Sequence, residues 1–235
     1  MSDQNCFSPL SLLRLQSWLS PTFPTGSYSY SHSIEWAVEA GHIHDRTSLV
    51  DWLEADLRYG SGRNEAIFFM EAWRCAMNDN PGRLIGTAKL AAAFRGTSEF
   101  AFETSQQAAA CLSALRRVWP DALVESFSAL LSELKIAPVL SVVFGVRAGR
   151  EAIPAMLALP AFLQSYVSNL VTAGVRLVPL GQTDGQLGIA ELEPAVLAVA
   201  EKSQAATIQD LGSAAFMVDL ASASHETQYT RLFRS

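Results

Sequence analysis

Two groups of residues near the start of the chain have side chains that could do chemistry. His42 and His44 stand two residues apart and His32 lies upstream, and imidazole is a common ligand of transition metals. Glu35 and Glu39 are four residues apart, so a helix would place both carboxylates on one face, where they could act as acid and base. However, no third metal ligand follows His44 closely, and a solvated turn and an exposed acidic face explain these residues equally well. We therefore predict neither a metal site nor a catalytic residue.

The motifs of two common enzyme classes are absent from the sequence. Residues 60–63 (GSGR) lack the spacing and the lysine of a phosphate-binding loop, and residues 96–100 (GTSEF) lack the closing glycine of a hydrolase nucleophile elbow. We expect a protein that is not an enzyme and that carries no cofactor. The alternative is a helical enzyme with a small-molecule pocket lined by Trp and Tyr, in which Glu35 serves as acid or base.

The last eleven residues, 225–235, combine residue types that dominate binding hot spots. They hold one His, one Tyr, one Phe, one Leu and two Arg, without Gly or Pro, whereas chain ends are normally bland. We expect this C-terminal tail, from about residue 222 to 235, to bind a partner and to become ordered on binding. A tail that folds back over its own chain is the equally weighted alternative. The candidate partner-binding residues are His225, Glu226, Gln228, Tyr229, Arg231, Leu232, Phe233 and Arg234.

A second candidate surface precedes and begins a predicted helix. Residues 27–33 are rich in Ser and Tyr; serines can cap exposed N–H groups, and tyrosines can bury their rings while the phenol stays hydrogen-bonded. This segment is either an elaborate helix N-cap or a surface for self-association or for a partner. The residues of this second surface are Pro24, Gly26, Tyr28, Ser29, Tyr30, His32 and Glu35.

The composition indicates a globular cytoplasmic protein. Of its 235 residues, 49% are hydrophobic and 17% charged, so a large core is available and surplus apolar surface points to a partner. The net charge of −6 argues against nucleic-acid binding. Residues 152–175 carry no charge but are interrupted by prolines and polar residues, which favours a buried, broken helix over a membrane span. The scattered Cys6, Cys75 and Cys111, and a start without a basic and apolar leader, fit a reducing cytosol.

Apolar residues recur mostly at helical spacing, so we predict an all-α fold. No linker or repeat divides the chain, which predicts one globular domain over residues 1–235, with ordered loops at 20–27 and 179–188. The domain is expected to contain about ten helices, near residues 8–19, 29–40, 47–59, 63–78, 81–94, 97–118, 120–135, 138–149, 152–176 and 190–219, the last two broken.

Several stretches taken together resemble one family. Residues 20–32 (SPTFPTGSYSYSH) with Glu35, residues 179–182 (PLGQ), and residues 225–229 (HETQY) with 231–235 (RLFRS) are similar to the UreF family of urease accessory proteins. The resemblance runs from about Leu12 to the last residue. The chain departs from the family pattern at Ser33, where a glycine is expected, at residues 223–224, and at Thr230. The lost glycine is expected to loosen one close helix contact.

The resemblance implies a non-catalytic scaffold or chaperone. It would form a homodimer, bind the accessory protein UreD (also called UreH) through its tail, and through that complex join the GTPase UreG and apo-urease. It would modulate GTP hydrolysis and help to route nickel to the urease active site through an enclosed path. The remaining alternative is a helical adaptor of another GTPase.

Overall fold

The computed structural model describes residues 8–234, and over this range the chain forms eleven α-helices, two 3-10 helices and no strand. The predicted all-α single domain is therefore confirmed. The α-helices are α1 (Pro9–Leu19), α2 (Ile34–Glu39), α3 (Arg46–Tyr59), α4 (Ser61–Met77), α5 (Pro81–Ala93), α6 (Ser98–Val118), α7 (Ala122–Glu133), α8 (Leu140–Arg150), α9 (Ala155–Leu177), α10 (Gln182–Ala205) and α11 (Phe216–His225). The 3-10 helices are η1 (Ser27–Ser29) and η2 (Ile208–Asp210).

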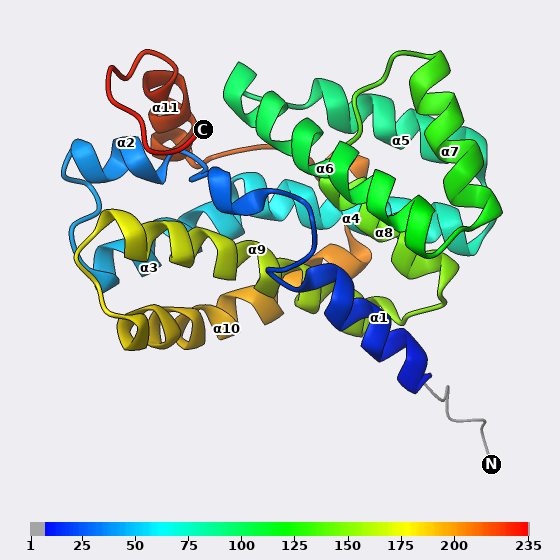
Figure 1. The fold of residues 1–235 in the computed structure, drawn as a ribbon, viewed down its shortest axis with the longest axis horizontal. Helices are drawn as coiled ribbons and strands as arrows, with labels where there is room; N and C mark the ends of the chain where they lie inside the picture. Colours follow the sequence, from blue (N-terminus) through cyan, green and yellow to red (C-terminus); the bar gives the residue numbers. More distant parts are fainter. Residues whose placement is uncertain (1–7, 235) are drawn as a thin grey trace.

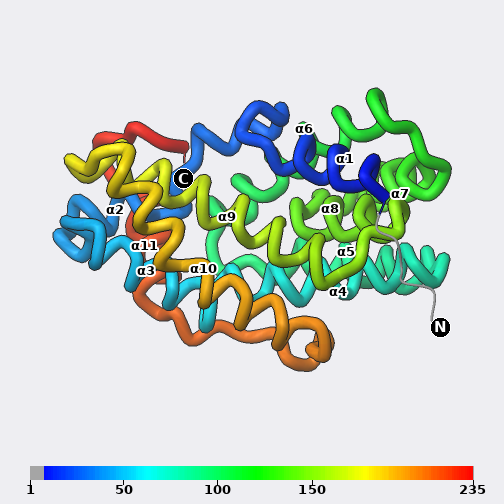
Figure 2. The backbone as a smooth tube through the Cα atoms, turned by 90° about the horizontal axis from the view of Figure 1, so that it is seen from below, coloured from blue at the N-terminus to red at the C-terminus, as the bar shows by residue number. Residues whose placement is uncertain are grey.

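Helix α4 runs along the middle of the molecule in the view of Figure 1 and contacts helices of both halves. It packs against α8, and α5, α6 and α7 complete that half. The other half contains α3, α9 and α10, with α10 alongside both α9 and α3 (Figure 2). The red C-terminal helix α11 lies next to the short helix α2, so segments nearly two hundred residues apart in sequence meet there.

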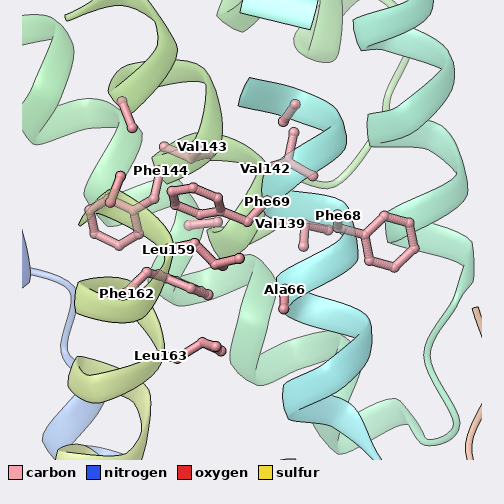
Figure 3. Close-up of a cluster of buried hydrophobic side chains, with 14 of the residues drawn as sticks. Ala66, Phe68, Phe69, Val139, Val142, Val143, Phe144, Leu159, Phe162 and Leu163 are labelled. Carbon is pink, nitrogen blue, oxygen red and sulfur yellow. The ribbon is translucent and has the colours of Figure 1, made fainter. Parts of the chain in front are cut away.

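Helices α4, α8 and α9 pack closely through glycines and aromatic side chains. A Cβ atom on Gly149 would come within 2.8 Å of the carbonyl oxygen of Trp73, so only glycine allows α8 to approach this closely. Phe69 of α4 stacks on Phe162 of α9 with ring centroids 5.2 Å apart, and Phe144 lies 5.8 Å from the same ring (Figure 3). These buried rings form the centre of the main hydrophobic core.

Helix α9 is continuous, so the break predicted within residues 152–176 is not found. It contains Pro160 in its second turn, where the loss of one backbone N–H leaves the rest of the helix intact. Its apolar side chains, including Leu159 and Leu163, are buried in the core. Within residues 8–234, no helix is long and apolar enough to cross a membrane.

Residues 182–188 of the segment predicted as a loop at 179–188 are instead the first turns of α10. Gly181 caps this helix, and its N–H donates to Asp184 Oδ2 at 3.2 Å. A Cβ on Gly185 would lie 2.9 Å from Val175 of α9, so this glycine permits close helix packing and does not mark a loop. The prediction also joined residues 190–219 into one broken helix, and the structure separates α10 from α11 by η2 and extended residues.

The predicted helix at residues 29–40 is divided into η1 and α2 by two left-handed residues. His32 has φ 53° and Ser33 has φ 67°, which side chains with a Cβ adopt at a cost. Ser33 is the position where the family pattern has glycine, so the departure imposes a backbone cost, and the loosened helix contact stays a prediction. The Ser33 hydroxyl donates to the carbonyl of its neighbour His32 at 2.5 Å.

Replacing Ser33 by glycine is expected to stabilise the protein. Glycine adopts φ near +67° freely, so the S33G variant should gain about 1 kcal/mol in the free energy of unfolding. Ser33→Ala, which keeps the Cβ and loses the hydroxyl, is the matched control and should not be stabilised. Urea denaturation of the three proteins measures this, and a destabilised S33G would show that the hydroxyl outweighs the backbone cost.

Candidate functional site

The C-terminal tail folds back over α2 and is held by one buried carboxylate. Glu35, in the first turn of α2, accepts the backbone N–H of Leu232 at 2.5 Å and of Phe233 at 2.9 Å. Glu35 is only 7% exposed. Hydrogen bonds to a buried carboxylate are stronger than those between neutral groups, so this contact fixes the direction of the chain end. Of the two alternatives for the tail, the structure therefore shows the fold-back over its own chain.

His225 connects the same carboxylate to α6. It is the last residue of α11 and is fully buried. Its Nδ1 lies 2.6 Å from Glu99 Oε2, and its Nε2 lies 3.3 Å from Glu35 Oε2. The other oxygen of Glu99 accepts from Arg231 Nη1 at 2.7 Å. We call the buried group of Glu35, Glu99 and His225 the tail seat.

The end of the tail is anchored a second time, at the C-terminal end of α9. The Arg176 guanidinium lies 4.5 Å from the centroid of the buried Phe233 ring, a cation–π contact. Arg176 Nη1 also donates to the carbonyl oxygen of Tyr28 at 2.8 Å. The N–H of Arg234 donates to the carbonyl oxygen of Ser29 at 2.9 Å. The tail is thus tied to the segment that precedes α2 as well as to α2 itself.

The eight predicted tail residues divide into two groups. His225 and Phe233 are buried within their own chain, so in this state they position the tail and do not meet a partner. The expectation that the tail is ordered only on binding is corrected accordingly. Tyr229 is fully exposed and Leu232 is 61% exposed. The polar residues Glu226, Gln228, Arg231 and Arg234 surround these two, with partners in the same chain: Ser98, Glu39, Glu99 and Ser29 respectively.

Glu226 secures the start of the tail to the beginning of α6. Its Oε1 accepts from the hydroxyl of Ser98 at 2.6 Å and from the N–H of Ser98 at 3.0 Å. These bonds, the hydroxyl bond first, lower the pKa of the Glu226 carboxyl against a small opposing effect of burial. The carboxylate also suits the N-terminal end of a helix dipole.

The predicted second surface at residues 24–35 is not one surface. Pro24 and Tyr28 are exposed, whereas Tyr30 and His32 are buried and Glu35 belongs to the tail seat. Gly26, with φ 72°, makes the turn that begins η1, and Ser29 accepts the N–H of Arg234. The segment therefore places several polar groups in buried positions, and neither Gly26 nor Ser33, the N-cap residues of η1 and α2, makes a side-chain capping hydrogen bond.

His32 lies in an acidic and aromatic environment. Its ring stacks on Phe100 with centroids 4.0 Å apart, and its Nδ1 lies 3.2 Å from Glu103 Oε2 of α6. Burial opposes the charged imidazole, but the charge and hydrogen bond of Glu103, with smaller effects of Asp56 and Glu65, raise the pKa of His32 above its ordinary value. Tyr166 donates to Asp56 Oδ2 at 2.6 Å, and burial followed by the charge of Asp56 raises the pKa of that phenol well above its ordinary value.

The other histidines considered as metal ligands do not join this group. His42 and His44 are exposed in the turn between α2 and α3, and His42 packs between the rings of Trp36 and Trp52. Among residues 8–234, no three or more His, Cys, Asp or Glu side chains are arranged to hold a metal ion. Cys75 and Cys111 are free buried thiols, and Cys6 lies outside the described residues.

Sequence reasoning missed Glu99, Arg176 and Glu103, which complete these buried groups. Glu99 lies in the first turn of α6, where an acidic residue is ordinary for a helix start, and no local pattern connects it to His225. A buried carboxylate becomes recognisable only when the partner that compensates it is known.

Changing Glu35 to Gln should release the tail. The amide oxygen can accept only one of the two backbone N–H groups in good geometry, and its NH₂ group then faces a donor, so we expect a loss of about 2 kcal/mol in the free energy of unfolding. The tail should become sensitive to carboxypeptidase. Glu39→Gln, one turn later on the same helix, is the matched control; Glu39 is exposed, bonds Gln228, and should change stability by less than about 0.5 kcal/mol. Equal protease resistance of E35Q and E39Q would contradict the role of Glu35.

The charge on His32 should depend on Glu103. In an NMR titration of the ring protons, the midpoint for His32 should lie above 6.5, and Glu103→Gln should lower it, because burial then dominates. A pKa raised on folding stabilises the native state fully below the unfolded value, so this contribution should be lost as the pH rises above 6.5 through the folded midpoint. A midpoint that is unchanged in E103Q would rule out Glu103 as the cause.

Comparison with known proteins places this arrangement in a family. The family model described as UreF matches residues 43–193. A protein from Rhodopseudomonas palustris (strain BisB5), described as urease accessory protein UreF, is 46% identical over 226 residues, covering 96% of this chain and 91% of that protein. Proteins of the same description from Bradyrhizobium diazoefficiens and Xanthobacter autotrophicus are 46% and 45% identical and cover 95% and 97% of this chain, or 91% and 93% of their own lengths. The resemblance to the family is thereby confirmed, and the chain belongs to the UreF family of urease accessory proteins.

Proposed function

We propose that this chain is a non-catalytic scaffold of urease maturation. It joins UreD (UreH) and the GTPase UreG to apo-urease during GTP-dependent nickel insertion and modulates GTP hydrolysis. In this proposal it acts in the cytoplasm as a homodimer, with no cofactor or metal of its own and no contact with nucleic acid or membrane. The proposal rests on the family, on the missing catalytic motifs, and above all on the exposed apolar side chains of α11 and the tail, which we call the C-terminal face.

This C-terminal face consists of five large apolar side chains on α11 and the tail. Each is at least 43% exposed, and they are Phe216, Met217, Leu220, Tyr229 and Leu232. Exposed aromatic and aliphatic side chains gathered on neighbouring elements are typical of protein–protein interfaces. Figure 1 shows α11 and the red tail together at one end of the molecule, so a partner can reach both at once.

The tail seat prepares this face for binding. Because Glu35 and Phe233 fix the tail, the exposed Tyr229 and Leu232 are held in place before a partner arrives. Preorganisation lowers the conformational entropy lost on association and so strengthens binding. We propose that UreD contacts the C-terminal face, with Arg231 and Arg234 at its rim. The face that meets UreG is proposed to include the exposed Pro24 and Tyr28.

The competing function, a helical enzyme with Glu35 as acid or base, finds little support. A general base needs a carboxylate that can reach a substrate proton. Glu35 instead accepts two backbone N–H groups and lies near His225, and Glu99 is held by His225 and Arg231. Both carboxylates are occupied by the chain itself.

Two substitutions on the C-terminal face should abolish complex formation. The double variant Tyr229→Ala, Leu232→Ala removes exposed side chains only, so circular dichroism should be unchanged, while capture of UreD in co-purification should weaken at least about tenfold, or about 1.4 kcal/mol. The matched control is Leu187→Ala, Leu197→Ala on α10, which removes two similarly exposed leucines elsewhere and should leave capture intact.

Truncation of the tail is a poor test of the same point. A chain ending at Ser224 would lose His225 and Phe233, and these are buried, so loss of binding would be confounded by loss of structure. Failure of the folded full-length chain to capture UreD would refute the scaffold function. The rate of GTP hydrolysis by UreG, with and without the captured complex, then tests the modulation separately.

A further inference from the structure

A cavity of about 370 Å³ is lined by residues of α1, α4, α6, α8 and α9 and by Asp219 of α11. Its wall contains both aromatic side chains, such as Phe100 and Phe162, and polar ones, such as Asn64 and Gln107. A cavity of this size is typical of sites for small organic molecules. None of the five side chains of the C-terminal face lines it.

Two buried nitrogens on the cavity wall lack a hydrogen-bond partner within the described part of the chain. They are Nε2 of His32 and Nη2 of Arg95. His32 is 9% exposed, and the side chain of Arg95 is 11% exposed. Unpaired buried polar groups are rare in folded proteins, because each has lost its bonds to water without replacement. Trp18 Nε1, on the wall formed by α1, is a third such group.

The two nitrogens differ in their hydrogen-bonding roles. Nη2 of Arg95 is a donor, because an arginine guanidinium only donates. Nδ1 of His32 lies 3.2 Å from Glu103 Oε2, so the remaining Nε2 donates in the charged ring and accepts in the neutral ring whose Nδ1 donates to Glu103. His32 also has a left-handed backbone, and strained backbone of this kind is concentrated at functional sites. A ligand that satisfies both groups must therefore offer an acceptor to Arg95 and either an acceptor or a donor to His32.

Glu65 interacts with both groups. Its Oε1 pairs with Arg95 Nη1, and its charge contributes to the raised pKa of His32. Arg95 is thus paired with Glu65, and His32 with Glu103. Glu103 in turn accepts from Gln107 Nε2 at 3.2 Å with its other oxygen. The carboxylates of both glutamates are engaged by other side chains, which disfavours a bare metal cation at these residues.

We propose that this cavity binds a small organic molecule through a planar carbonyl or carboxylate group. One oxygen of that group accepts from Arg95 Nη2, the second polar atom of the group bonds His32 Nε2, and the apolar body of the molecule packs against the Phe100 ring and its aromatic neighbours. The inference is independent of the scaffold function, since neither side chain belongs to the C-terminal face.

The test measures binding of benzoate and benzamide to the full-length chain by calorimetry, with the His32 ring nitrogens followed by ¹⁵N NMR. We expect saturable binding of at least one probe with one molecule per chain, and a shift of the Nε2 signal. Binding of benzoate alone identifies a carboxylate ligand, and binding of benzamide alone identifies a neutral carbonyl ligand. Binding of both probes shows that the carbonyl oxygen they share is sufficient. Each of these outcomes supports the site.

Two variants test whether His32 and Arg95 bind the probes. His32→Asn removes the ring in a residue type that tolerates a left-handed backbone, and Arg95→Lys keeps the charge but loses the forked donors. Each should weaken probe binding about tenfold, the usual effect of losing one charged hydrogen bond. His44→Asn, at an exposed histidine, is the matched control and should bind as the parent chain does.

The proposal has clear contrary outcomes. Absence of saturable binding of both probes to a folded chain would show that the cavity holds only water. Unchanged affinity in folded H32N and R95K would place any binding elsewhere. Ni²⁺ alone, added as its chloride, provides the last comparison: loss of the His32 signals with Ni²⁺, without binding of either probe, would identify a metal ligand and overturn the organic-ligand proposal.

Discussion

The placement of the C-terminal part of this protein depends on the buried carboxylate of Glu35. Burying a carboxylate without hydrogen bonds is costly, and burying backbone N–H groups without acceptors is costly as well. At the tail seat these two costs offset each other, because Glu35 accepts the N–H groups of Leu232 and Phe233. Neither group is stable in its buried position without the other. The chain is consequently closed between its first short helix and its end.

The region around α4 and α8 and the region around α11 are stabilised by different kinds of interaction. Around α4 and α8 the contacts are apolar, with stacked phenylalanines and glycines that allow close approach. Near α11 a separate, smaller apolar cluster contains Phe100, Ala215 and Val218, with Trp52 packed against it, and Glu35, Glu99 and His225 add buried hydrogen bonds. The elements that carry the C-terminal face are therefore stabilised largely by polar contacts. The strength of these contacts depends on charge and geometry more than on buried area.

The sequence was sufficient to predict most helices because their apolar faces repeat at helical spacing. Helices α3, α4 and α6 lie within two residues of their predicted positions, and α1 and α5 begin at prolines that follow the capping residues Ser8 and Asn80. The loop predicted at residues 179–188 was wrong because Gly185 serves helix packing. The tail seat could not be predicted, since it joins Glu35, Glu99 and His225 across long sequence separations without any local pattern.

Two short segments contribute to both the tail seat and the cavity. Residues 32–35 place His32 in the cavity wall and Glu35 in the seat, and residues 99–103 do the same with Glu99 on one side and Phe100 and Glu103 on the other. In the first segment, the left-handed pair His32–Ser33 turns the chain so that two side chains three residues apart enter different buried sites.

That backbone strain, about 1–3 kcal/mol per residue, is offset by the hydrogen bonds which each buried side chain then makes. The tail and the cavity are accordingly joined by packed, hydrogen-bonded backbone on two elements. Such contiguous contacts are the physical means by which the occupancy of one site can influence another.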